Sequence, residues 1–139
     1  MEEIYVSEVM TKNVTACSPD TAIKDVIKIL SRNSISSLII TENDEPVGII
    51  TERDLVAIME EMLNDIARDH LPIVHFMTSP TLTIHSHITL REAVRFAIDK
   101  NIRHLPVVDQ NNKLIGLLTQ TNMVRSLSYI AFTLSRKSS

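Results

Sequence analysis

The stretch Gly48-Ile49-Ile50-Thr51-Glu52-Arg53-Asp54 decides how this chain is organised. Its pattern recurs 68 residues later as Gly116-Leu117-Leu118-Thr119, with Asn122 at the position that corresponds to Asp54. The whole chain contains 2 glycines, and they occupy the same place in the two stretches. Chance rarely aligns both glycines of a chain in this way, so the pattern indicates an internal repeat.

The repeat extends outward from these stretches. Val9-Met10-Thr11 recurs as Phe76-Met77-Thr78, and Ile23-Lys24-Asp25 recurs as Leu90-Arg91-Glu92, both 67 residues later. The second copy gains one residue after Glu42, which changes the offset to 68. The same order of matching segments in both halves predicts two copies of one supersecondary unit.

We place the two copies at residues 6–69 and 74–134, with Pro72 in the joint between them. In the first copy the expected order is a strand at 14–17, a helix that Asp20 or Thr21 caps, strands at 37–41 and 47–50, and a helix at 52–67. In the second copy it is a strand at 82–84, a helix at 89–99, strands at 105–108 and 114–118, a helix from Thr121 onward, and a polar tail at 135–139.

Apolar residues at helical spacing support the two helices of the first copy. The first helix would bury Ile23, Val26, Ile27 and Leu30, and the second would carry Ile58, Met59, Met62, Leu63 and Ile66 on one face. One such unit has few strands, but two can close a core together. We therefore predict an α/β (α+β) fold of two β-α-β-β-α repeats, packed with pseudo-twofold symmetry into one compact module.

The composition is that of a globular chain. Of 139 residues, 44% are hydrophobic and 22% charged. The acidic start lacks the features of a signal peptide, and no apolar run has the length of a membrane span, so we expect a cytoplasmic protein. Cys17 is the single cysteine, and we expect it to be a small buried residue of a strand.

Charge is distributed unequally along the chain. Up to Asp69 there are 14 acidic and 6 basic residues, whereas from His70 onward there are 3 acidic and 8 basic ones. Unequal solvation of two ordinary halves, head-to-tail pairing of two chains and an anion site in the second half would each produce this pattern. The net charge of −3 and the 4% of aromatic residues argue against a nucleic-acid partner.

Common catalytic motifs are absent from the sequence. It contains no Gly-x-Ser-x-Gly, P-loop, His-Glu-x-x-His or Cys-x-x-Cys pattern, so we do not expect an enzyme. His75, His85 and His87 lie close in sequence, but no cysteine or acid accompanies them at metal-ligand spacing. We therefore predict no metal site and no required cofactor.

Read together, the repeated motifs resemble a pair of cystathionine-β-synthase (CBS) domains, a stand-alone Bateman module. The resemblance rests on the two Met-Thr starts, on Ser18-Pro19-Asp20-Thr21, on His104-Leu105-Pro106-Val107-Val108-Asp109, and on Gly48-Ile49-Ile50-Thr51-Glu52-Arg53-Asp54. It implies binding of an adenosine ligand (AMP, ADP, ATP or S-adenosylmethionine) in the cleft between repeats, a homodimer, and regulation of a partner protein whose identity is unknown.

The residues of this motif have chemistry that suits a nucleotide. Thr51 stands at a helix start, where the backbone N–H groups favour phosphate, although an ordinary N-cap would look the same. Asp54, in the first helical turn, can accept both hydroxyls of a ribose, or it is simply an acid at a helix start. Arg53 can reach a phosphate or pair with a nearby acid. Gly48 leaves room for close approach of a backbone.

The second repeat departs from the pattern at Asn122, which can accept one ribose hydrogen bond but is neutral. Arg103 and His104 offer phosphate donors there, or they are a solvated arginine and a partly buried histidine. The expected nucleotide-binding residues are therefore Thr51, Asp54, Arg53, Ile35, Ser37, Val14, Arg103, His104, Pro106, Thr119 and Asn122, with Ile35 and Val14 beside the base. The alternative is a ligand-free dimerisation or interaction scaffold.

Overall fold

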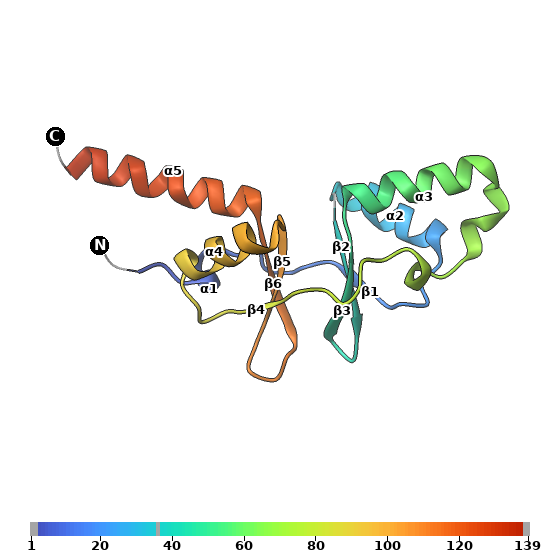
Figure 1. Ribbon diagram of the computed structural model, residues 1–139, viewed down its shortest axis with the longest axis horizontal. Helices are drawn as coiled ribbons and strands as arrows, with labels where there is room; N and C mark the ends of the chain where they lie inside the picture. The colour runs from blue at the N-terminus through green and yellow to red at the C-terminus, as the bar shows by residue number, and fades with distance from the viewer. Residues whose placement is uncertain (1–2, 36, 138–139) are drawn as a thin grey trace. The chain divides into compact units, whose positions relative to one another are not determined.

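The computed structural model describes residues 3–35 and 37–137 (Figure 1). Ser36, which the sequence analysis matched to Arg103, lies outside the described residues. The described part is a mixed α+β structure with two three-stranded sheets and five α-helices. The elements are α1 (Val6–Val9), β1 (Ala16–Cys17), α2 (Ile23–Asn33), β2 (Leu38–Glu42), β3 (Glu45–Ile50), α3 (Glu52–Asn64), η1 (Ile66–His70), η2 (Ile73–His75), β4 (Ile84–His85), α4 (Leu90–Lys100), β5 (His104–Val108), β6 (Leu114–Thr119) and α5 (Gln120–Lys137).

The chain packs as two compact units whose limits differ from those of the sequence repeats. The first-repeat unit comprises Thr15–Thr81 together with Asn112–Leu114. The second-repeat unit comprises the chain up to Val14, Leu82–Asn111 and the chain from Ile115 onward. The start of each repeat, with its Met-Thr pair, therefore packs with the later elements of the other repeat.

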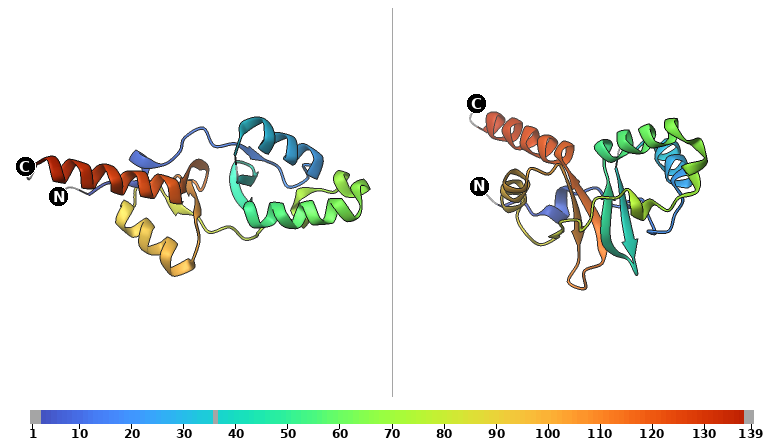
Figure 2. Two further views of the ribbon diagram at one scale, coloured as in Figure 1. Left: turned by 90° about the horizontal axis from the view of Figure 1, so that it is seen from above. Right: turned by 45° about the vertical axis from the view of Figure 1, so that its right-hand side comes forward.

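In the first-repeat unit the strand order is β1-β2-β3, and α2 and α3 lie on the same side of this sheet (Figures 1 and 2). β1 runs parallel to β2, while β2 and β3 form the predicted antiparallel hairpin. Asn43 and Asp44 make its turn with φ values of 51° and 64°. Asn and Asp tolerate this left-handed conformation because their short polar side chains bond locally.

Helix α2 confirms three of its four predicted core positions, with Ile27 only partly buried, but it does not confirm the predicted cap. Ile23, Val26 and Leu30 are buried in the core of the unit, as their spacing indicates. The N-cap residue is Ala22, which provides no side-chain hydrogen bond. The side chains of Ser18, Asp20 and Thr21 instead bond with one another in the turn before the helix. Asp20 and Thr21 are occupied by this local network and do not cap α2.

Helix α3 starts as predicted but ends earlier, at Asn64. Asp65 has an extended backbone, and its side chain accepts a hydrogen bond from the N–H of Ala67, which begins η1. The predicted apolar face is also divided. Ile58 is buried, whereas Met59 and Leu63 are 53% and 87% exposed. Part of that face is therefore on the surface of the unit.

The second-repeat unit has the equivalent strand order β4-β5-β6. Thr89 caps α4 by accepting a hydrogen bond from the N–H of Glu92 at 3.1 Å. Val6 of α1 is fully buried in the same core as Leu105 and Leu118. Helix α5 continues to Lys137, so the expected polar tail is helical over its described residues, because helical hydrogen bonding continues past the last core contacts.

Among the residues that the structure describes, no helix combines the length and the apolar character required to cross a bilayer.

Candidate functional site

Thr51 and Asp54 lie together at the start of α3. The backbone N–H of Thr51 donates to Asp54 Oδ2 at 3.0 Å, and the Thr51 hydroxyl donates to the same oxygen at 3.3 Å. The Thr51 side chain in turn accepts from the backbone N–H of Asp54, which completes a capping box. The motif therefore has a structural role at the helix start, and this role fixes where the half-buried carboxylate lies.

Thr78, from the start of the second repeat, completes this cluster. Its hydroxyl donates to both oxygens of Asp54, each at 3.2 Å. Its backbone forms an antiparallel bridge with Ile49 of β3, with N···O distances of 2.9 and 3.1 Å. We call Thr51, Asp54 and Thr78 the Asp54 site. The sequence analysis missed Thr78, although the repetition of its Met-Thr pair was a signal.

The second-repeat unit contains an equivalent cluster of Thr11, Thr119 and Asn122, which we call the Asn122 site. Asn122 Oδ1 accepts from the backbone N–H of Thr119 at 2.8 Å and from the Thr119 hydroxyl at 3.0 Å. Asn122 Nδ2 donates to the Thr11 hydroxyl at 3.3 Å. The backbone of Thr11 bridges to Leu117 of β6, as that of Thr78 does to Ile49.

The two clusters differ in hydrogen-bonding capacity. The Asp54 carboxylate has two oxygens that only accept. Oδ2 already accepts from Thr51 and Thr78, while Oδ1 can accept a further hydroxyl. The Asn122 amide has one oxygen, which Thr119 already occupies, and an NH₂ group that donates. The carboxylate also places a negative charge at the start of α3, where it opposes a phosphate, whereas the start of α5 carries no such charge.

Three further predicted residues belong to the first-repeat unit. Arg53 is exposed on the first turn of α3, Ile35 is half-buried against the core, and Ser37 is buried just before β2. Among the described residues, the hydrogen bonds to the Asp54 carboxylate come from Thr51 and Thr78, so the structure does not join these three side chains to it.

The other predicted residues belong to the second-repeat unit. Arg103 is exposed, Val14 and His104 are half-buried, and Pro106 is buried within β5. The carbonyl of Arg103 accepts from the N–H of Gln120 at 2.9 Å. Because Gln120 follows Thr119 directly, this bond holds the backbone of Arg103 beside the start of α5.

His85 and His87 are candidates for a metal site, and Cys17 is a candidate for a reactive thiol. The rings of His85 and His87 lie 5.4 Å apart, and within the described residues no group of three or more His, Cys, Asp or Glu side chains could hold a metal ion. Burial raises the pKa of the half-buried Cys17 thiol, a hydrogen bond with Thr21 lowers it, and Asp20 raises it. This environment is the opposite of that of a reactive thiol.

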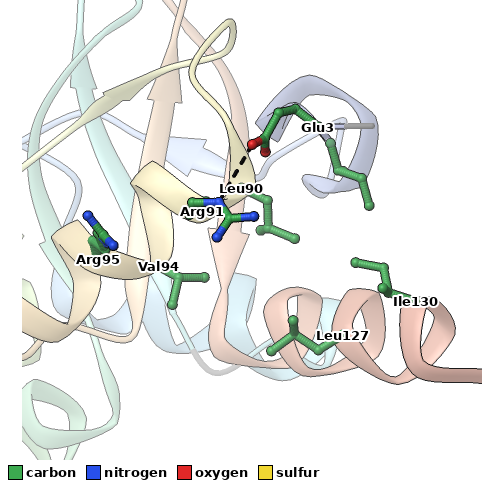
Figure 3. Close-up of a pocket in the computed structure, with 8 residues that line it drawn as sticks. Glu3, Leu90, Arg91, Val94, Arg95, Leu127 and Ile130 are labelled. Carbon is green, nitrogen blue, oxygen red and sulfur yellow. Dashed lines mark ion pairs between the residues drawn. The ribbon is translucent and has the colours of Figure 1, made fainter. Parts of the chain in front are cut away.

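An apolar groove of about 400 Å³ lies within the second-repeat unit, and none of the residues that line it is a predicted site residue (Figure 3). Leu90 and Val94 of α4 face Leu127 and Ile130 of α5 across it. Arg91 and Arg95 stand on its α4 side, and Arg91 forms an exposed ion pair with Glu3 at 3.6 Å. The groove thus combines an apolar floor with a basic rim.

Comparison with known proteins identifies a matching family and several similar proteins. The family model described as CBS domain matches residues 6–61 and 67–129. An uncharacterized protein of Methanopyrus kandleri is 37% identical over 99% of this chain and 69% of its own length. The inosine-5'-monophosphate dehydrogenase of Methanocaldococcus jannaschii is 30% identical over 88% of this chain, but the chain spans only 23% of that enzyme.

Solved structures share the fold. CBSX2 from Arabidopsis thaliana, a CBS-pair protein, superimposes with a TM-score of 0.81 at 27% identity, covering 94% of this chain and 98% of that one. The crystal structure of CBSX2 in complex with AMP gives a TM-score of 0.79 at 28% identity, covering 92% and 98%.

Proposed function

This chain belongs to the CBS domain family, and on that premise we propose that it is a regulatory module that binds an adenosine nucleotide through the Asp54 site. The observation that carries the proposal is the Asp54 carboxylate, held at the start of α3 by Thr51 and Thr78. Oδ1 of this fixed carboxylate has an acceptor position left for a ligand, and this suits one hydroxyl of a ribose. The complex of CBSX2 with AMP supports the choice of ligand.

The two clusters suit different chemical groups. Asp54 suits a ribose hydroxyl. The start of α5, which has no acidic residue in its first turn, suits a phosphate, and the backbone of Arg103 is hydrogen-bonded next to it. His104 would add a donor next to Arg103, and Thr119 a hydroxyl. Val14, Ile35, Ser37 and Pro106 remain proposed contacts of the base or sugar, and Arg53 a proposed phosphate contact.

A thermal-shift titration against AMP, ADP, ATP, S-adenosylmethionine and GMP tests the proposal. A ligand present at 100 times its Kd stabilises a protein by about 2.7 kcal/mol, which for a chain of this size raises Tm by roughly 8–10 °C. We expect one adenosine ligand to produce such a saturable rise and GMP to produce less. Asp54→Ala should weaken the affinity about 10- to 100-fold, because a ligand hydrogen bond to a charge is lost.

The thermal stability of ligand-free Asp54→Ala must be measured in parallel, since loss of the capping box costs about 1 kcal/mol by itself. The matched control is Asn122→Ala, which removes the equivalent cap in the other unit. Equal affinity of Asp54→Ala and the unmodified chain would contradict the ribose assignment.

A second candidate function is a ligand-free interaction scaffold, and the groove between α4 and α5 favours it. We propose a second copy of the chain as the occupant. Helix α3 has exposed Val56, Met59 and Leu63, with Glu60 and Glu61 on the same helix. Glu61 pairs with Arg68 and Arg91 pairs with Glu3, so Glu60 and Arg95 carry the charge complementarity by which α3 of one copy would lie in the groove of the other. A homodimer of this kind is compatible with nucleotide binding.

In either role the chain would act on a separate regulated protein by changing conformation or association when the ligand binds. We assign it no catalytic step. A pull-down with and without the nucleotide identified by thermal shift would reveal such a protein, and ligand-independent capture would favour the scaffold.

A further inference from the structure

Thr78 belongs to the start of the second repeat, which packs within the first-repeat unit and is hydrogen-bonded to the edge of β3. Besides the backbone bridge between Thr78 and Ile49, the Ser79 hydroxyl donates to the carbonyl of Val47 at 3.0 Å. Ile73, at the start of the segment, is fully buried in the core of the first-repeat unit. Residues 73–79 therefore form a docked strap, and the Thr78 hydroxyl is the point where this strap contacts Asp54.

The two oxygens of Asp54 accept different numbers of hydrogen bonds. Oδ2 accepts from the Thr51 backbone, the Thr51 hydroxyl and the Thr78 hydroxyl. Oδ1 accepts only from Thr78 among the described residues. A carboxylate oxygen offers about two lone-pair sites, so Oδ1 can accept a further hydroxyl while Thr78 holds the plane of the carboxylate. Without Thr78, only the Oδ2 side would be restrained.

We propose that Thr78 is a positioning residue that couples docking of the strap to ligand binding at Asp54. The proposal rests on the proposed function and adds a mechanism of regulation to it. A docked strap orients the carboxylate for the ribose, and a bound ribose fixes the carboxylate that holds the strap. Ligand binding and strap docking therefore stabilise each other, and the segment between the repeats reports whether the site is occupied.

Affinity measurements with AMP on Thr78→Val and Thr78→Ser, each in the unmodified and the Asp54→Asn background, test this coupling. Valine keeps the β-branched shape and the backbone bridge but removes the hydroxyl, whereas serine keeps the hydroxyl. We expect Thr78→Val to weaken AMP binding about 3- to 5-fold, because Thr78 acts on the ligand only through Asp54, and Thr78→Ser to restore it. In the Asp54→Asn background Thr78→Val should have less than a twofold effect. The control for affinity is Thr89→Val, which removes the hydroxyl that caps α4 and lies outside both clusters.

Hydrogen exchange at the amides of Ile49 and Thr78 supplies the second readout. AMP should slow exchange at both amides in the unmodified chain but not in Thr78→Val. Without ligand, the Thr78→Val variant should already exchange faster than the unmodified chain at the amides of Ile49 and Thr78. The Thr11→Val variant should exchange at the same rate as the unmodified chain at these two amides.

Each half of the proposal has an outcome that overturns it. An equal loss of affinity from Thr78→Val in both backgrounds would show that Thr78 contacts the ligand itself, and no loss at all would remove its role. If the unmodified chain binds no nucleotide, the proposed function fails. Hydrogen exchange in the ligand-free chain then still tests whether the Thr78 hydroxyl holds residues 73–79 on β3. If Thr78→Val exchanges at the same rate as the unmodified chain, that role is contradicted as well.

Discussion

The sulfur of Met77 lies directly over Gly48 of β3. A Cβ atom added to Gly48 would come within 2.4 Å of Met77 Sδ, and the same 2.4 Å separates a Cβ added to Gly116 from Met10 Sδ. Neither glycine has a positive φ, so the reason for glycine is space and not backbone conformation. The space that the sequence analysis assigned to the approach of a backbone is occupied by a methionine side chain. The two glycines and the two Met-Thr starts are therefore parts of one packing arrangement that occurs in both units.

Gly48→Ala should destabilise the chain by about 1–3 kcal/mol, the usual cost of overpacking. The cost should shrink when Met77 is also changed to Ala, because the clashing sulfur is then absent. Denaturant unfolding of the four variants of this double-mutant cycle measures the coupling. The pair Gly116 and Met10 provides a matched cycle in the other unit, and additive costs in both cycles would contradict the packing argument.

Asn122→Asp should convert the Asn122 site into a second carboxylate site. Asn122 Oδ1 already accepts from the Thr119 backbone as Asp54 Oδ2 does from Thr51, at 2.8 and 3.0 Å. The substitution should therefore preserve the bond to the Thr119 backbone and change Tm by less than about 3 °C, since an acid in the first turn of a helix is worth about 0.3–1 kcal/mol. Isothermal titration with adenosine should show tighter binding or a second site. Unchanged titration would mean that the side chain at position 122 does not limit binding.

Reversing charges tests the proposed dimer. Arg95→Glu and Glu60→Arg should each weaken self-association, because each places like charges together, and the double variant should restore much of it. Light scattering coupled to gel filtration measures the mass. Arg125→Glu, on an exposed residue of α5 that does not line the groove, is the control. A dimer that both single reversals, Arg95→Glu and Glu60→Arg, leave intact would rule out the pairing of α3 with this groove.

The Cys17 thiol should react slowly with alkylating reagents in the folded chain. Because burial, the largest effect, raises its pKa, the folded chain keeps the thiol proton to a higher pH than the unfolded chain does. As the pH rises past the ordinary thiol range the unfolded chain loses its proton first, so this group makes folding less favourable there. Alkylation by iodoacetamide at pH 8 should be much slower in the folded chain than in denaturant. Asp20→Asn should accelerate it, and equal rates for the folded and unfolded chains would contradict the assignment.

Most of the secondary structure could be predicted because its signals are local. The 3.6-residue spacing of Ile23, Val26 and Leu30 places one face of α2 in the core, and the same residues are buried in the structure. The errors occur where local groups had several possible partners. Asp20 and Thr21 bond within their own turn instead of capping α2. Leu63 keeps helical spacing yet is exposed, because spacing specifies a face but not what covers it.

The sequence by itself determined the repeat, the order of strands and helices, and the two Thr-x-x-Asp/Asn helix starts, since each of these depends on residues within a few positions of one another. Only the tertiary structure decided that Thr78 joins Asp54 and that Thr11 joins Asn122, across 24 and 111 residues. The two Met-Thr segments are nearly alike, and so are the two strand edges that accept them. Local sequence therefore cannot choose between the pairings, and the choice depends on burying Ile73 in one core and Val6 in the other.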